Sequence, residues 1–146
     1  MKRVIVAVIA GLCLCHTGYA QSSSLEWQFD LHAKRNAFTY VYMGNGYSEL
    51  KVSEEVTKEF SKVKFVKILK SEQPNSKEVK NAIKNVRFFA GADEFVLALK
   101  IAEQGEDKTE IYLRRSGKNE LEKVIIRENS KEVSVTWIYG EEKQEK

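Results

Sequence analysis

The chain has 146 residues, of which 42% are hydrophobic and 31% are charged, with one proline and two cysteines. This composition is typical of a globular domain and excludes collagen-like, disordered and disulfide-scaffold proteins. With 24 basic and 21 acidic residues, the formal net charge is +3.

The N-terminus has the three parts of a secretory signal peptide. A basic Met1-Lys2-Arg3 precedes an uncharged apolar run over residues 4–15, and Gly18-Tyr19-Ala20 places small residues before a cleavage point. The run is shorter than the ~20 residues that a spanning helix needs. We therefore expect residues 1–20 to be a signal peptide, cleaved after Ala20, and the mature chain to have no stable membrane insertion.

Cleavage would also change the thiol content and the charge of the protein. Cys13 and Cys15 each follow a leucine rather than a small residue, so we expect no lipidation and no cysteine in the mature chain. Removing Lys2 and Arg3 leaves 22 basic against 21 acidic residues, a net charge of +1. Nucleic-acid binding therefore has no electrostatic support, and export makes it less plausible still. Whether the exported protein stays in the periplasm or becomes extracellular is left open.

The first half of the mature chain predicts a lead, a strand, a helix and a second strand. Residues 21–36 are expected to be an N-terminal lead, in which Trp27 and Phe29 alternate. Residues 37–43 are β-branched and aromatic and predict a strand. Ser53 and the acids after it favour a helix start, with Val52, Val56, Phe60 and Val63 at helical spacing. Residues 65–69 predict the next strand.

The second half predicts one helix and four strands. Residues 73–76 break the chain, and Ser76 can cap a helix whose apolar stripe is Val79, Ala82, Ile83 and Val86. From residue 95 the apolar period becomes two, with Phe95, Leu97, Leu99 and Ile101 expected on one face. Strands over 111–114, 121–127 and 133–139 follow after short turns.

These elements predict an α+β fold: an antiparallel sheet, strand-helix-strand-helix followed by a four-strand meander, with two helices packed on one face. We expect a single domain over residues 37–140 and a charged tail over 141–146. If the face of Leu97 and Leu99 is core, replacing either by alanine should cost ~2–5 kcal/mol. Period-two alternation leaves open which sheet face is buried.

The chain resembles a family of small exported bacterial proteins catalogued as domain of unknown function 4252. The stretches that carry the resemblance are residues 38–43, the hairpin of 95–100 and 109–114, and the pair 120–126 and 133–140, which ends in a glycine. The sequence departs from the family at Gly44-Asn45-Gly46, where the family continues into a helix. The resemblance implies an exported α+β domain, often of the cell envelope, and carries no catalytic signature.

Residues that could support catalysis are few. His32 is the single histidine of the mature chain, and Asp30 near it makes no metal-ligand pattern, so we interpret it as a surface or edge histidine. Asp93 and Asp107 could complete a triad with His32, but no serine lies in a nucleophile-elbow pattern and both acids have turn contexts. Carboxylate pairs are unavoidable among 21 acids and indicate nothing.

Exposed aromatic and basic side chains are the remaining candidates. Tyr112, Arg114 and Arg115 form a small basic-aromatic cluster, either an ordinary solvated sheet face or a contact for an anion or protein. The aromatic residues of the first and last strands are core, or an exposed patch if the opposite faces are buried.

The sequence thus predicts an exported, non-enzymatic protein that binds another envelope protein through a sheet face or edge, without a cofactor or metal. The alternative is a small-molecule carrier or small hydrolase whose site has no recognisable motif. Attachment to a membrane surface is disfavoured, because neither predicted helix combines a large apolar face with a basic one. The oligomeric state is left open.

Overall fold

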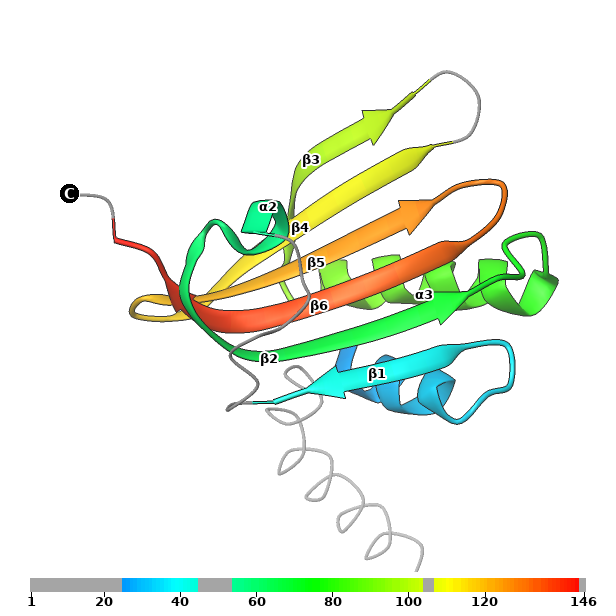
Figure 1. Cartoon of the computed structure of the whole chain (residues 1–146), viewed down its shortest axis with the longest axis horizontal. Helices are drawn as coiled ribbons and strands as arrows, with labels where there is room; N and C mark the ends of the chain where they lie inside the picture. The colour runs from blue at the N-terminus through cyan, green and yellow to red at the C-terminus, as the bar shows by residue number, and fades with distance from the viewer. Residues whose placement is uncertain (1–24, 45–53, 104–106, 145–146) are drawn as a thin grey trace, which may run out of the picture.

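The computed structural model describes residues 25–44, 54–103 and 107–144 (Figure 1). Within them a helical segment at residues 25–33 is followed by two further helices and six strands. In chain order these are β1 (Thr39–Met43), α2 (Glu54–Thr57), β2 (Phe60–Ser71), α3 (Lys77–Ala92), β3 (Val96–Ala102), β4 (Lys108–Gly117), β5 (Glu120–Glu128) and β6 (Val133–Glu142).

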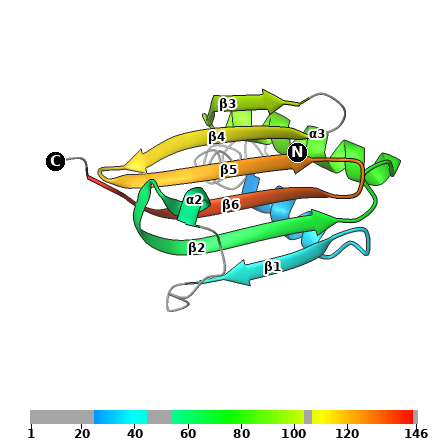
Figure 2. The same ribbon diagram turned by 45° about the horizontal axis from the view of Figure 1, so that its top comes forward.

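All strand pairs of the sheet are antiparallel, and the strand order is β1-β2-β6-β5-β4-β3. Strands β3 to β6 form the predicted meander, since short turns join them in sequence. Strand β6 then pairs with β2, so α3 carries the chain across the sheet from β2 to the far edge. Strands β1 and β3 are consequently the two edges (Figures 1 and 2).

The larger core lies between the sheet and two helices on one face, α3 and residues 25–33 (Figure 1). Helix α3 follows Ser76, as predicted, and buries the apolar stripe Val79, Ala82, Ile83, Val86 and Ala90. Facing it are Val124, Ile126, Val135 and Trp137, from alternate positions of β5 and β6. An α+β fold with two helices on one face is confirmed, but one of the two helices is not the one predicted.

Residues 25–33 were expected to belong to an extended lead and are helical instead. Leu25 and Phe29 are fully buried in the main core, one turn apart on the same side of this helix. The backbone N–H of Leu25 also donates to Asp93 Oδ2 at 2.9 Å. The folded domain therefore begins before residue 37. At the other end β6 runs to Glu142, so the expected tail over 141–146 starts within a strand.

The helix predicted from Ser53 is one short turn, α2; Ser53 itself lies outside the described residues. Strand β2 already begins at Phe60, because its ladder runs the whole length of β6, from Phe60 opposite Glu142 to Ser71 opposite Val133. Helix α2 lies on the opposite sheet face from α3, where Lys123 Nζ donates to the carbonyl of Val56 at 3.0 Å (Figure 1).

Both sheet faces carry a core, which answers the question that alternation left open. On the face opposite α3, a second cluster includes Val66, Ile125 and Ile138, each at most 3% exposed. The aromatic residues of the first and last strands, β1 and β6, point to the other side. There Trp137 is buried and packs edge-on against Phe65 of β2, with ring centroids 5.4 Å apart, whereas Tyr42 on the edge strand is 56% exposed. We call the face with the second cluster the α2 face and the other the α3 face.

Strand β3 contradicts its predicted pattern. A bulge at Ala98 shifts the register, so Leu97 lies opposite Tyr112 whereas Leu99 lies opposite Ile111. Tyr112 belongs to the α3-face cluster and Ile111 to the α2-face cluster. Leu97 and Leu99 therefore point to opposite faces, and both are exposed because β3 is an edge strand. The prediction that they share one face is wrong.

Candidate functional site

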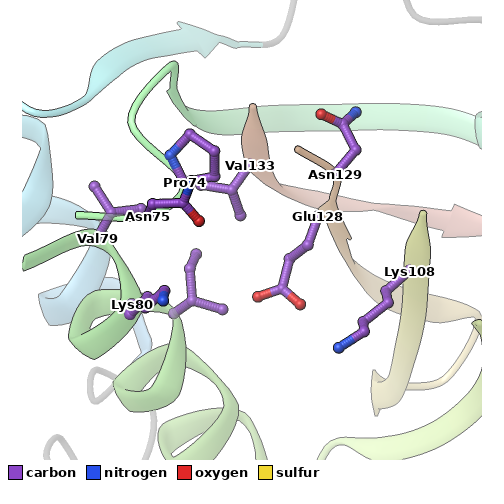
Figure 3. Close-up of a pocket in the computed structure, with 9 residues that line it drawn as sticks. Pro74, Asn75, Val79, Lys80, Lys108, Glu128, Asn129 and Val133 are labelled. Carbon is purple, nitrogen blue, oxygen red and sulfur yellow. The ribbon is translucent and has the colours of Figure 1, made fainter. Parts of the chain in front are cut away.

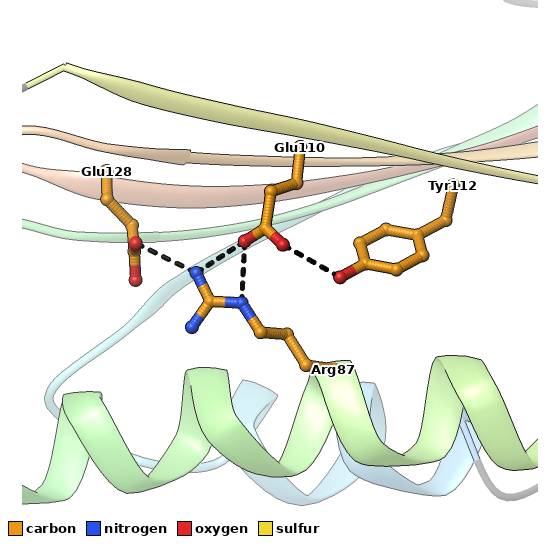
Figure 4. A network of polar contacts seen from close by, with 4 residues as sticks. All are labelled: Arg87, Glu110, Tyr112 and Glu128. Atoms are coloured by element: carbon orange, nitrogen blue, oxygen red, sulfur yellow. Dashed lines mark hydrogen bonds and ion pairs between the residues drawn. The ribbon is translucent and has the colours of Figure 1, made fainter. Parts of the chain in front are cut away.

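The most elaborate polar cluster joins α3 to the sheet (Figure 4). Arg87 on α3 donates to Glu110 Oε1 on β4 at 2.7 Å and to Glu128 Oε2 on β5 at 2.8 Å. The Tyr112 hydroxyl donates to the other oxygen of Glu110 at 2.9 Å. Arg87 thus pairs with both carboxylates. Without these partners, burial would disfavour its charged guanidinium.

These charged and polar contacts hold α3 against the sheet. We call Arg87, Glu110, Tyr112 and Glu128 the clamp. Burial together with the hydrogen bond to Glu110 raises the pKa of Tyr112 to about 12, so its hydroxyl stays protonated. Burial opposes the charge of Arg87, but its hydrogen bonds to Glu128 and Glu110 outweigh that effect and raise its pKa. Tyr112 therefore stays neutral and Arg87 stays charged, as in a structural ion-pair network.

The three predicted surface residues do not form one surface. Tyr112 is buried in the clamp. Arg114 donates to Glu122 Oε2 and to the carbonyl of Asp93, both at 2.8 Å, and its guanidinium lies 4.4 Å from the centre of the Phe95 ring. Arg115 lies opposite Leu121 of the α2-face cluster, is largely exposed, and pairs with Glu142.

His32 was expected at the surface and is 2% exposed. Its ring packs against Phe38, with centroids 5.3 Å apart, and neither ring nitrogen has a hydrogen-bond partner among the described residues. Burial, reinforced by the nearby Arg35, lowers its pKa, so the imidazole is held neutral. His32 therefore belongs to the packing of helix 25–33 rather than to the surface.

A hollow of about 240 Å³ lies beside the clamp, where α3 faces the ends of β4 and β5 (Figure 3). Val79 and Lys80 line it from α3, and Lys108, Glu128 and Asn129 line it from the strands and the turn after β5. This volume is below the ~300–1,000 Å³ of typical ligand pockets, so the hollow would admit only a very small molecule. Of its charged groups, Glu128 is already paired with Arg87, which leaves Lys80 and Lys108 facing the space.

The most unusual surface is β3 itself. All seven of its residues are exposed, including four large apolar side chains: Val96 at 68%, Leu97 and Leu99 at 45% and Ile101 at 44%. No described strand pairs with its outer side. Every second residue of an edge strand directs its N–H and C=O groups outwards, so β3 presents both unpaired backbone groups and apolar side chains.

The apolar character of β3 continues into the neighbouring strand on the α2 face. Val96 lies opposite Leu113, and Leu99 lies opposite Ile111. Leu113 and Ile111 are half-buried and pack against the second core cluster. The other edge, β1, is shorter, with five residues, and exposes Val41 and Tyr42. We call Val96, Leu99 and Ile101 with the outer backbone of β3 the β3 edge; it is the candidate functional site.

The sequence contained a partial signal for this site. Residues 96–102 hold one charge, Lys100, and no proline, whereas exposed edges usually carry several charges or a proline. The apolar alternation was nevertheless interpreted as a core strand, because alternation is the same in a central strand and an unprotected edge.

No protein-family model, curated protein or solved structure matches the chain. The resemblance to the exported family described above therefore stays a prediction. Among the described residues, no helix has the length and apolar character needed to cross a membrane.

Proposed function

We propose that the protein is exported and acts by binding, taking up an extended segment of another envelope protein as an additional strand at the β3 edge. The observation that carries this proposal is a largely apolar edge strand in which all seven residues are exposed. Soluble proteins usually protect such edges with charge, proline or a covering element, because a bare edge is a template for pairing with another chain.

In strand addition, backbone hydrogen bonds would supply affinity and side-chain contacts would set the register. The outward N–H and C=O groups of β3 would form a new antiparallel or parallel ladder, which is independent of the partner's side chains. The exposed side chains Val96, Leu99 and Ile101 would add contacts on the α2 face, where Ile111 and Leu113 extend the apolar surface. Such an interaction needs no nucleophile, metal or cofactor.

Export rests on the signal-like residues 1–20, which lie outside the described residues. A cut after Ala20 is compatible with the fold, because the buried Leu25 and Phe29 remain in the mature chain. N-terminal sequencing of protein from the envelope or medium should begin at Gln21. A protein recovered from those fractions with Met1 still present would contradict a cleaved signal.

A second candidate function, a small-molecule carrier, is favoured by the hollow that Lys80 and Lys108 line. A ligand there would raise the thermal stability of the protein, and Lys108→Gln would reduce that effect.

The proposed function is tested by affinity purification of tagged protein from cells of the source organism, comparing wild type with Leu99→Lys and Val41→Lys. Leu99 and Val41 are similarly exposed, at 45% and 40%, but lie on opposite edges of the sheet. An envelope protein that co-purifies with wild type and Val41→Lys, but not with Leu99→Lys, supports binding at β3. A partner retained equally by all three proteins would contradict it.

A further inference from the structure

We propose that the segment bound at the β3 edge alternates acidic and apolar residues, with its acidic side chains toward Lys100 and Lys108 on the α3 face. This inference rests on the proposed function and specifies the chemistry of the partner. It follows from the different charge and apolar content of the two sides of β3.

The register places two lysines together on the α3 face beside the edge. Lys100 lies opposite Glu110, and Ala102 lies opposite Lys108. Glu110 and Tyr112 of this face point to the α3 side, so Lys100 and Lys108 share it. Ala102 is small and exposed, so it leaves room for the long side chain of Lys108 to reach a strand added beyond β3.

Neither lysine is neutralised among the described residues. Both are exposed, and neither forms an ion pair there. Each lysine lies opposite an acid, Lys100 opposite Glu110 and Lys108 opposite Glu128, but Arg87 pairs with both carboxylates (Figure 4). Lys80, which lines the same hollow as Lys108, adds a third positive charge (Figure 3). The α3 side of the edge therefore carries positive charge beside the exposed Leu97, whereas its α2 side is apolar.

A partner strand must match both sides at once, because successive side chains of a strand point to opposite faces. Acidic residues at alternate positions would meet Lys100 and Lys108, and apolar residues between them would meet Val96, Leu99 and Ile101. Glu94 precedes β3 and Glu103 follows it, and both are exposed. Their repulsion would place the acidic residues of the partner near the middle of the edge rather than at its ends.

The same charges argue against a second copy of the chain as the occupant. Strand β3 has the sequence VLALKIA, which contains a lysine and no acid. Antiparallel pairing of two β3 strands would bring two copies of Lys100 to one ladder with no carboxylate between them. Like charges at such close range disfavour pairing. An acidic partner removes this conflict.

The inference is tested with three fluorescein-labelled nine-residue peptides that alternate valine with glutamate, serine or lysine. Their dissociation constants for the purified protein are measured by fluorescence anisotropy at 20 mM and 200 mM salt. We expect the glutamate peptide to bind about threefold to tenfold more tightly than the serine peptide, the range that one or two exposed ion pairs supply. The lysine peptide should bind most weakly, and higher salt should narrow the differences.

Substitutions separate the charge effect from the strand pairing. Lys100→Glu should abolish the preference for glutamate and improve binding of the lysine peptide, whereas Leu99→Lys should weaken all three peptides. The matched control is Lys34→Glu, which makes the same charge change at an exposed lysine on the segment after helix 25–33. It should leave the order of affinities unchanged. Equal thermal melting midpoints of the variants would establish that they fold.

The possible failures are distinguishable. Equal affinities for the glutamate and serine peptides, with both lost in Leu99→Lys, would overturn the acidic partner while leaving binding at the β3 edge intact. Absence of binding by all three peptides would overturn both. A concentration-dependent dimer in analytical ultracentrifugation that Leu99→Lys dissolves would show that a second copy occupies the edge, and would overturn the acidic partner.

Discussion

Gly140 on β6 gives the sharpest test of the packing, because its side of the ladder leaves no room for a methyl group. It lies opposite Val63 in an irregular part of the β2–β6 pairing, with register shifts on both sides. A Cβ atom on Gly140 would lie 2.2 Å from the carbonyl oxygen of Lys62 and 2.9 Å from Val63 Cα. Both atoms belong to the backbone, so no side-chain rotation relieves the clash.

Gly140→Ala must therefore push β2 and β6 apart near one end of the longest ladder in the sheet. Overpacking of this kind costs ~1–3 kcal/mol, and we expect about 3 kcal/mol because the backbone itself has to move. For a domain of this size the melting temperature should fall by roughly 12 °C. The matched control is Gly91→Ala in α3, where a Cβ would meet nothing within 4 Å. It should stabilise by ~0.5–1 kcal/mol through helix propensity.

Urea unfolding of the three proteins, followed by fluorescence of the buried Trp137, measures both effects. Two-state transitions with equal slopes would allow the midpoints to be compared directly. A Gly140→Ala protein within ~0.5 kcal/mol of wild type would refute the close approach of β2 and β6 at this position.

Three further predictions concern the edge, the buried histidine and the cysteines. Leu99→Ala or Leu97→Ala should cost less than ~1 kcal/mol in urea unfolding, whereas Ile126→Ala should cost ~2–5 kcal/mol, since Ile126 is 1% exposed; equal costs would contradict the edge position of β3. Because burial and Arg35 lower the pKa of His32 below its ordinary 6.5, its contribution to stability is complete above that pH and is lost as the pH falls. The urea midpoint should thus decrease from pH 7.5 to pH 5.5, and less so in His32→Gln; an equal decrease in the variant would exclude His32 as the cause. Protein cleaved after Ala20 should have the same melting temperature with and without reductant, and a decrease would show that cleavage is misplaced.

Elements whose residue pattern is compatible with only one secondary structure were predictable from the sequence. Helix α3 has a breaker, a capping position and an uninterrupted apolar stripe, and it begins where expected. Strand β6 alternates cleanly, and Val133, Val135 and Trp137 are buried as that alternation requires. Local signals were sufficient here because tertiary packing favours the same structure as the local preference.

The predictions for other elements were wrong because tertiary packing decided between two secondary structures that the local sequence allows. Residues 25–33 were interpreted from Trp27 and Phe29 as alternating, whereas the helical spacing runs through Leu25, Phe29 and His32. The polar His32 within that stripe hid it, although the residue is buried. Phe60 has a helical relation to Val56, yet it joins β2 because a full-length ladder with β6 outweighs one more turn of helix.

The candidate site could not be predicted from the sequence, because it depends on the order of strands. Leu99 and Ile101 would be core residues in a central strand, and only the crossover by α3 places β3 at the edge. The bulge at Ala98 likewise leaves no mark in the sequence, since no glycine or proline accompanies it. The type of function, binding through a sheet face or edge, was inferred from the lack of catalytic motifs and stays a prediction.

The central claim is that a partner binds at the β3 edge. The most direct measurement places a photo-crosslinking amino acid in turn at Leu99 on β3, at Val41 on β1 and at Phe88 on α3, in cells of the source organism. All three positions are exposed. We expect one adduct of defined mass from Leu99 and none from Val41 or Phe88. An adduct of the same mass from Val41 or Phe88, with none from Leu99, would contradict it.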